Sequence, residues 1–171
     1  MATKTKERLQ STDVVKAMGM ETDQAKGVVQ ILSRVLADIQ VLYVKTLNYH
    51  WNIVGPAFYS IHELLEEQYN ALKQAGDQVA ERIRMYGQPV IGSMKAFQAH
   101  ATLQEKTEVQ LLEIDSIQEL ADDHEAVVAA LRQDITTCSE EYEDEGAADL
   151  LTALLQEHQK MAWMLRSIAR S

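Results

Sequence analysis

Residues that interrupt helices are scarce in this chain: of its 171 residues, only two are proline and seven are glycine. These two residue types are the least favourable in a helix interior, and sheet proteins use them at many turns. Between the few interruptions, apolar residues recur every three or four positions, as they do on the buried face of an amphipathic helix. The pattern therefore predicts a small number of long helices.

Four helical segments are predicted, over residues 23–52, 59–86, 107–137 and 147–168. A short helix over residues 93–101, capped by Ser93, is expected in the long connection between the second and third segments. Long amphipathic helices with one longer crossover are typical of a ferritin-like bundle. We therefore predict an all-α fold, a ferritin-like four-helix bundle with a short extra helix between helices 2 and 3.

The predicted bundle occupies residues 21–171 and follows a polar N-terminal segment over residues 1–20. Lys4, Lys6 and Arg8 make this segment net positive, and it shows little periodicity before about Val14. We expect the segment to be a mobile tail.

Charge and cysteine content limit the classes of function. The net charge of −10 argues against a protein whose whole surface grips nucleic acid, because phosphate binding needs clustered lysine and arginine. A single cysteine, Cys138, excludes an intrachain disulfide framework and fits a reducing compartment. No apolar run approaches the length of a membrane span, and the N-terminus lacks the apolar stretch of a secretory signal. Cytoplasmic localisation without a membrane partner is the expectation.

Histidines and carboxylates form one line on the second predicted helix. His62 and Glu66 lie four residues apart, and Asp77 and Glu81 repeat this spacing further along. At 3.6 residues per turn these four positions share one side of the helix. His50 ends the first helix, and the short turn at Gly55 should bring it level with His62. Imidazole together with carboxylate suits iron, and manganese or zinc by the same chemistry.

The two pairs are too far apart to hold one metal cluster within a chain. Eleven residues separate Glu66 from Asp77, or about 16 Å along a helix, whereas metal–ligand bonds are near 2 Å. A two-fold axis near Ala71 resolves this, because residue numbers of facing positions on antiparallel copies have a constant sum. His62 with Glu81, and Glu66 with Asp77, both add to 143. The small residues Ala71, Ala75 and Gly76 would let the two copies approach.

Two further observations bear on this hypothesis. Acidic pairs four residues apart are also common on solvated helix faces, so the arithmetic is suggestive only. A di-iron centre within one bundle needs Glu-x-x-His motifs, and no acid stands three positions before any of the five histidines. A site shared between chains is therefore the better interpretation.

Several segments resemble the signature of the Dps mini-ferritins, the DNA-binding proteins from starved cells. They include residues 45–58 with His50-Trp51-Asn52, residues 62–66 (HELLE), residues 77–82 (DQVAER) with Gly87, and residues 162–166 (AWMLR). The resemblance covers nearly the whole chain from about Asp23, in the same order and spacing. Position 66 is often Asp in this family, and Glu adds a methylene group there.

The resemblance implies a function and a ligand set. His50, His62 and Glu66 of one subunit would join Asp77 and Glu81 of a two-fold partner in a ferroxidase centre. The family forms hollow dodecamers that oxidise Fe(II), preferably with hydrogen peroxide rather than oxygen, and store Fe(III) mineral inside. This chemistry would protect DNA under oxidative stress. Zinc could substitute for iron at the same ligands.

Other residues have weaker assignments. Asp149 is a candidate for the three-fold iron pores that the resemblance implies, although acids at a helix start are also favourable electrostatics. Trp51 is either a buried interface aromatic or a redox neighbour of the metal. His100, His124 and His158 match nothing in the signature and are interpreted as surface or core histidines. Acids of the third helix could face the cavity and seed mineral (Glu108, Glu113, Asp115, Glu119, Asp122 and Asp123).

Two functions of different classes remain open at this point. The first is an iron-oxidising storage enzyme. The second is a cage-forming or DNA-compacting structural protein whose metal site is vestigial or holds zinc. The N-terminal lysines offer only a weak DNA contact, which twelve copies would multiply and the negative shell would oppose. DNA binding, with association to the nucleoid, therefore stays doubtful.

Overall fold

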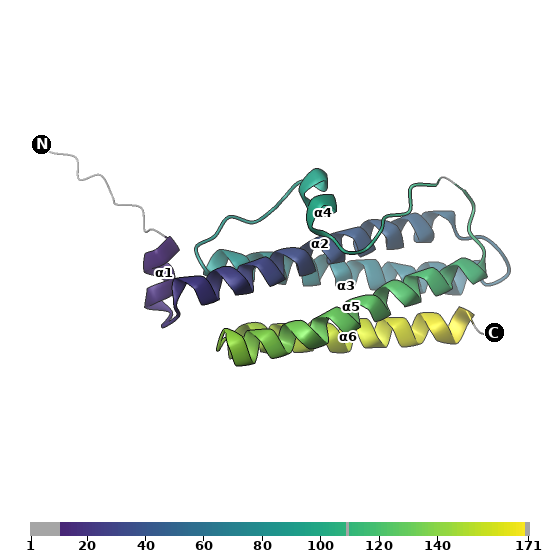
Figure 1. The fold of residues 1–171 in the computed structure, drawn as a ribbon. Helices are drawn as coiled ribbons and strands as arrows, with labels where there is room; N and C mark the ends of the chain where they lie inside the picture. The colour runs from purple at the N-terminus through teal and green to yellow at the C-terminus, as the bar shows by residue number, and fades with distance from the viewer. Residues whose placement is uncertain (1–10, 109, 170–171) are drawn as a thin grey trace, which may run out of the picture.

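The computed structural model describes residues 11–108 and 110–169, and these form a four-helix bundle (Figure 1). The long helices are α2 (Thr22–Asn52), α3 (Phe58–Met85), α5 (Ile117–Thr136) and α6 (Glu145–Ala169). Shorter elements are α1 (Ser11–Ala17), α4 (Met94–His100), a 3₁₀ turn η1 (Ile114–Ser116) and a π-helical turn η2 (Thr137–Glu141). The predicted fold class, including the short helix in the long connection, is confirmed.

The long helices pair as α2 with α3 and α5 with α6. A tight turn with Gly55 at φ 113° returns the chain from α2 into α3, a conformation that favours glycine. The connection after α3 passes α4, which lies on α2, and returns along the bundle before α5 begins (Figure 1). Ion pairs Arg34–Asp134 and Lys45–Asp123 show that α5 runs antiparallel to α2, because one number falls as the other rises.

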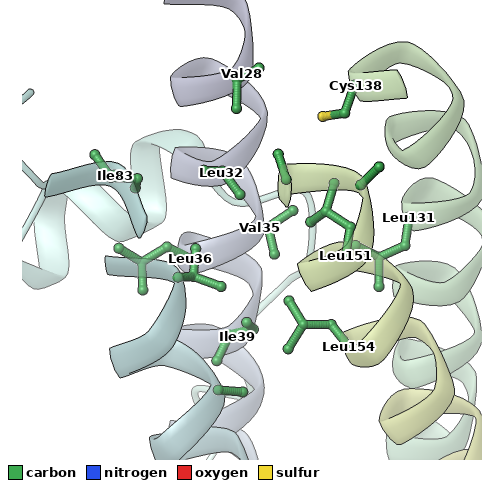
Figure 2. Packing of buried hydrophobic residues seen from close by; sticks show 14 of the residues in the cluster. Val28, Leu32, Val35, Leu36, Ile39, Ile83, Leu131, Cys138, Leu151 and Leu154 are labelled. Carbon is green, nitrogen blue, oxygen red and sulfur yellow. The ribbon is translucent and has the colours of Figure 1, made fainter. Parts of the chain in front are cut away.

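The core between the helices is apolar and close-packed. Figure 2 shows side chains of α2 meeting those of α3, α5 and α6 (Leu32, Val35, Leu36, Ile39, Ile83, Leu131, Leu151 and Leu154). Each of these is at most 2% exposed. A fully buried leucine or isoleucine contributes roughly 1.5–3 kcal/mol, so this face of α2 holds the two helix pairs together.

The third long helix begins ten residues later than predicted. Periodicity indicated a start at Thr107, but α5 starts at Ile117. Leu112 is instead bound through its backbone to the end of α2, where its N–H donates to the Asn52 carbonyl and its carbonyl accepts from Val54. Its side chain is buried in the core although the residue lies outside any helix. The neighbouring Leu111 fits the helical spacing of Ile114 and Ile117 but is 71% exposed, so the apolar spacing of this segment does not mark a helix.

The second half of the predicted N-terminal segment contains a helix. Residues 11–17 form α1, and Val15 is only 1% exposed, packed into the main core cluster. Residues 1–10, with Lys4, Lys6 and Arg8, lie outside the described residues.

One helix has the length and apolar composition of a membrane span. Among the described helices only α2 meets both criteria, and 50% of its most apolar stretch is buried within the bundle. The central helix of a bundle meets the same criteria, so this observation is weak evidence for a span.

Candidate metal centre

His50 and His62 meet where α2 ends and α3 begins. The tight turn between the two helices places the rings in a stack, with centroids 3.7 Å apart and planes 18° apart. Each ring is bound to the other residue's backbone: Nδ1 of His50 lies 2.9 Å from the carbonyl of His62, and Nδ1 of His62 lies 2.9 Å from the carbonyl of His50. The two hydrogen bonds are reciprocal and lock both rings.

These hydrogen bonds determine the tautomer of both histidines. A carbonyl oxygen can only accept, so each Nδ1 must carry the hydrogen and donate. Each Nε2 then keeps a free lone pair, the form of imidazole that binds a metal ion. A hydrogen bond from the second ring nitrogen to a carbonyl is also the usual support of a metal-binding histidine. The backbone carbonyls of the two histidines therefore orient both rings for binding a metal ion.

Glu66 completes a group of three ligands. It lies one turn after His62 on α3 and is exposed, whereas His50 is buried and His62 is half-buried. Ligand atoms of the three residues lie within 4.8 Å of one another, the only such group of three or more potential ligands among the side chains that the structure describes. Two imidazoles and a carboxylate form a donor set that suits iron, zinc or manganese.

Two aromatic residues that sequence reasoning missed hold the rings. Phe58 lies against His62 with ring centroids 5.0 Å apart, and Tyr69 meets His50 edge-on at 5.2 Å. Partial burial, and then the negative charge and hydrogen bonding of Glu66, raise the pKa of the Tyr69 hydroxyl. Tyr69 stands three positions after Glu66, and this helical spacing was the available signal for a neighbour of the site.

Asp77 and Glu81 lie apart from this group. Both are exposed on α3, further along the helix. Asp77 lines a groove of about 410 Å³ that lies between α2, α3 and the segment around α4. The exposed position of both acids leaves them accessible to another molecule, and their role as ligands stays a prediction.

Two of the small residues near the proposed two-fold axis do not face a partner, contrary to the prediction. Ala75 and Gly76 are buried inside the chain, and a Cβ on Gly76 would lie 2.9 Å from the Gln40 amide nitrogen on α2. These small residues therefore let α3 approach α2 of the same chain, so they are not free to face a partner. The exposed residues nearest the proposed axis are Asn70 and Lys73.

The remaining candidates are distributed over the molecule. Asp149 is exposed near the start of α6, and Trp51 is 68% exposed in the single chain. Glu119 and Asp123, two of the possible cavity acids, are held in ion pairs with Lys45. Burial would raise the pKa of Glu119, but hydrogen bonds from Lys106, Lys45 and Tyr49 lower it to about 2. His100 is exposed, and His124 and His158 form a buried pair.

The bundle and its histidine–carboxylate group define the class of protein. Residues 29–171 match the ferritin-like domain family. A solved Dps protein from Vibrio cholerae, described as a member of the ferritin-like diiron-carboxylate superfamily, shares 29% identity and a TM-score of 0.82, covering 94% of this chain and 98% of that one. The fold is ferritin-like.

Relatives narrow the class to one family. DNA protection during starvation protein 2 from Bacillus anthracis is 32% identical over 83% of this chain and 96% of its own length. An uncharacterized low temperature-induced protein from Nostoc sp. is 42% identical over 88% of this chain and 84% of its own length. A Dps structure from Bacillus brevis matches with a TM-score of 0.79 at 32% identity, covering 86% of this chain and 98% of that one. This chain belongs to the Dps family.

Proposed function

We propose that this protein is a ferroxidase that stores iron. Fe(II) binds to His50, His62 and Glu66 of one subunit together with the partner's Asp77 and the partner's Glu81. The observation that carries the proposal is the pair of reciprocal hydrogen bonds, which leaves the Nε2 atoms free on two histidines that group with Glu66. The oxidised iron is deposited as mineral inside a hollow homo-dodecamer.

The ligand types fit the redox chemistry. Neutral imidazole favours capture of Fe(II), and carboxylates hold the harder Fe(III) product. Hydrogen peroxide takes one electron from each of two Fe(II) ions and, with two protons, becomes two water molecules. Pairwise oxidation releases no hydroxyl radical, and this would protect DNA. Dioxygen can serve as a slower oxidant of the same ions.

Surface features of the single chain support assembly. Trp51, Phe58 and Tyr59 are all exposed beside the histidine pair, at 68%, 42% and 72%. Large apolar side chains gathered in one exposed place are typical of an interface. The groove that Asp77 lines adjoins the same face of α3. A two-fold partner placed against α3 would cover these features and bring its acids to the histidines.

Subunit complementation tests the shared site directly. One chain carries His62→Ala with Glu66→Ala, and the other carries Asp77→Ala with Glu81→Ala. Each assembly alone should fail to oxidise Fe(II) with peroxide. In a mixed dimer one of the two centres regains every ligand, so random mixing should restore about one quarter of the wild-type rate.

A matched mixture controls this experiment. Chains with His62→Ala and Glu66→Ala are mixed with chains that carry His50→Ala, so that both lesions fall in the same half of the site. No mixed dimer then contains an intact centre, and the rate should stay at background. Equal rates in the two mixtures would contradict a centre shared between subunits.

A cage whose centre holds zinc is the second candidate. The imidazole and carboxylate donors at His50, His62 and Glu66 favour it, because they accept Zn²⁺ as readily as iron. Zn²⁺ titration before Fe(II) addition separates the two functions. A ferroxidase should be inhibited by Zn²⁺ but oxidise iron without it, whereas a zinc cage would show no iron oxidation in either state. We expect either protein to work in the bacterial cytoplasm.

A further inference from the structure

The core of the bundle is interrupted by a layer of polar residues. Buried apolar side chains form two separate clusters, one ending near Leu42 and Leu72 and the other beginning near Tyr49 and Leu65. Between them each long helix contributes one buried polar side chain to the interior. These residues are Thr46 of α2, Gln68 of α3, His124 of α5 and His158 of α6, and each is at most 3% exposed. The four side chains point into the interior of the bundle, whereas the proposed ligand Glu66 is exposed.

Hydrogen bonding in the layer is incomplete. Thr46 Oγ1, Gln68 Oε1 and His124 Nε2 are buried without a partner. Unpaired buried polar atoms are costly and rare, so three of them in one layer indicate that something else satisfies them. Water or a bound ligand are the two physical solutions.

The two histidines face each other through the same ring atom. Nδ1 of His124 and Nδ1 of His158 are 2.8 Å apart, so one donates and the other accepts. An unpaired buried N–H costs more than an unpaired acceptor, so we assign the shared hydrogen to His124 Nδ1 and leave its Nε2 bare. Burial lowers the pKa of His158 to about 4 and the pKa of His124 further below its usual range. Both rings are therefore neutral near pH 7, the state that binds metals.

A surface pocket leads toward this layer. It lies between α3 and α6 and has a volume of about 170 Å³. Its lining includes Gln68 of the layer, the thioethers of Met161 and Met164, and the charged side chains Glu67, Glu157 and Lys160. Met161 stands one turn after His158 on α6, and its carbonyl lies 3.5 Å from the Gln68 amide nitrogen. Two thioethers thus line the surface pocket that borders the layer at Gln68.

The lack of charge in the layer favours a monovalent ion over a divalent one. All four polar residues are neutral, and Asp123 beside His124 is already paired with Lys45 at 2.6 Å. A divalent ion would enter this interior without a compensating carboxylate, at a large desolvation cost. A monovalent ion costs less, and imidazole with thioether is the donor combination that suits Cu(I).

We propose that His124 and His158 form a binding site for a single Cu(I) ion inside each subunit, reached through the methionine-lined pocket. Two nitrogens on one metal lie about 3.4 Å apart at trigonal angles, so the rings need to separate only slightly. The ion replaces the shared hydrogen, which moves to His124 Nε2 without net release of a proton. Gln68 Oε1 and Thr46 Oγ1 are the free acceptors for that N–H, as metal-binding histidines require.

Competition with bicinchoninate under anaerobic conditions tests the proposal in the assembled protein. The background carries His50→Ala and His62→Ala to remove the surface histidines, and Cys138→Ala to remove the thiol. This protein should take about one Cu(I) per chain from the chelator. His124→Leu with His158→Leu should abolish that uptake, whereas His100→Ala, at an exposed histidine, should leave it unchanged.

X-ray absorption on the copper-loaded background protein gives a second readout that does not depend on folding of the leucine variant. Nitrogen ligation with at most one sulfur is expected. Sulfur-only ligation, unchanged uptake after the double leucine substitution, or no uptake by the background protein would each overturn the site. Because the His50 and His62 ligands are absent throughout, these outcomes are separate from those of the ferroxidase test.

Discussion

At the scale of single residues, the histidine pair at the bundle end shows how backbone and side chain cooperate. His50 and His62 each donate Nδ1–H to the other's carbonyl, so their ring orientation and tautomer are determined before any ion binds. Preorganisation of this kind lowers the entropy cost of binding. The two residue types and their positions could be predicted from the sequence, but not the reciprocal bonds, because these depend on the path of the turn between α2 and α3.

The buried pair His124 and His158 predicts the stability of the fold in mild acid. Their pKa values are depressed in the folded protein, whereas the unfolded chain binds protons below about pH 6.5. The unfolded state therefore binds more protons, and stability should fall from pH 6.5 toward pH 4. The slope is up to about 1.4 kcal/mol per pH unit for each histidine.

Urea unfolding between pH 7.5 and pH 4 measures this slope. His124→Leu with His158→Leu should flatten this slope, and His100→Ala should not. A slope that is unchanged in the leucine variant would show that other groups cause the acid sensitivity.

Glu119 contributes to stability in a different pH range. Its pKa is lowered to about 2 in the folded protein, so its stabilisation is lost only below about pH 4.5.

At the scale of elements, buried polar side chains fix how helices and connections lie against one another, which the apolar periodicity of a single helix does not determine. Asp38 of α2 is 1% exposed and accepts from the backbone of Thr102, 2.6 Å away, and of Leu103, 3.1 Å away, as well as from Arg34. It anchors the long connection after α4 against the bundle. At the other side, Asp144 accepts from Ala147 N–H and Arg82, which ties the start of α6 to the end of α3.

Substitution of Asp38 should therefore be costly. Asp38→Ala leaves two backbone N–H groups without their partner and removes one of the two carboxylates that pair with Arg34, and we expect a loss of about 3 kcal/mol in the free energy of unfolding. Asp23→Ala is the matched control, because Asp23 pairs with Lys26 at the exposed start of α2. Its removal should cost less than about 0.5 kcal/mol. Similar losses in the two variants would refute the role of Asp38.

At the scale of the whole molecule, the proposed metal centre depends on how α3 of one subunit packs against α3 of another. Glu66 and Asp77 are too far apart along one helix to share an ion, and both are exposed. An antiparallel partner would bring Asn70 opposite the partner's Lys73, since these numbers also add to 143. A chain with Asn70→Cys and Lys73→Cys should form an interchain disulfide on oxidation, visible as a dimer on a non-reducing gel.

Glu67→Cys provides the control for this crosslink. Glu67 is also exposed on α3 but lines the pocket beside α6, away from the proposed axis. It should remain monomeric on the same gel. A dimer from Glu67→Cys alone, or none from the Asn70 and Lys73 pair, would place the partner on another face of the helix.

Net charge leads to a prediction about nucleic acid. Some relatives are named for DNA protection, but this chain carries a net charge of −10. Anionic shells repel phosphate backbones, and contacts from the N-terminal segments would have to overcome that repulsion even when an assembly multiplies them. We expect no gel retardation of DNA at 150 mM salt, either in the full chain or in a chain without residues 1–12. Retardation by the full chain alone would assign DNA binding to its N-terminal segment.

The sequence by itself determined the helical fold, the order of the long helices and the candidate ligands. Two prolines and seven glycines leave little choice but helices, and a helix places residues four apart on one side whatever surrounds it. Such local rules do not determine which segments far apart in the sequence come into contact. The late start of α5, the burial of Ala75 and Gly76 against α2, and the meeting of His124 with His158 all depend on packing between helices. Only the tertiary structure decided them, because side chains far apart in sequence compete for the same interior space.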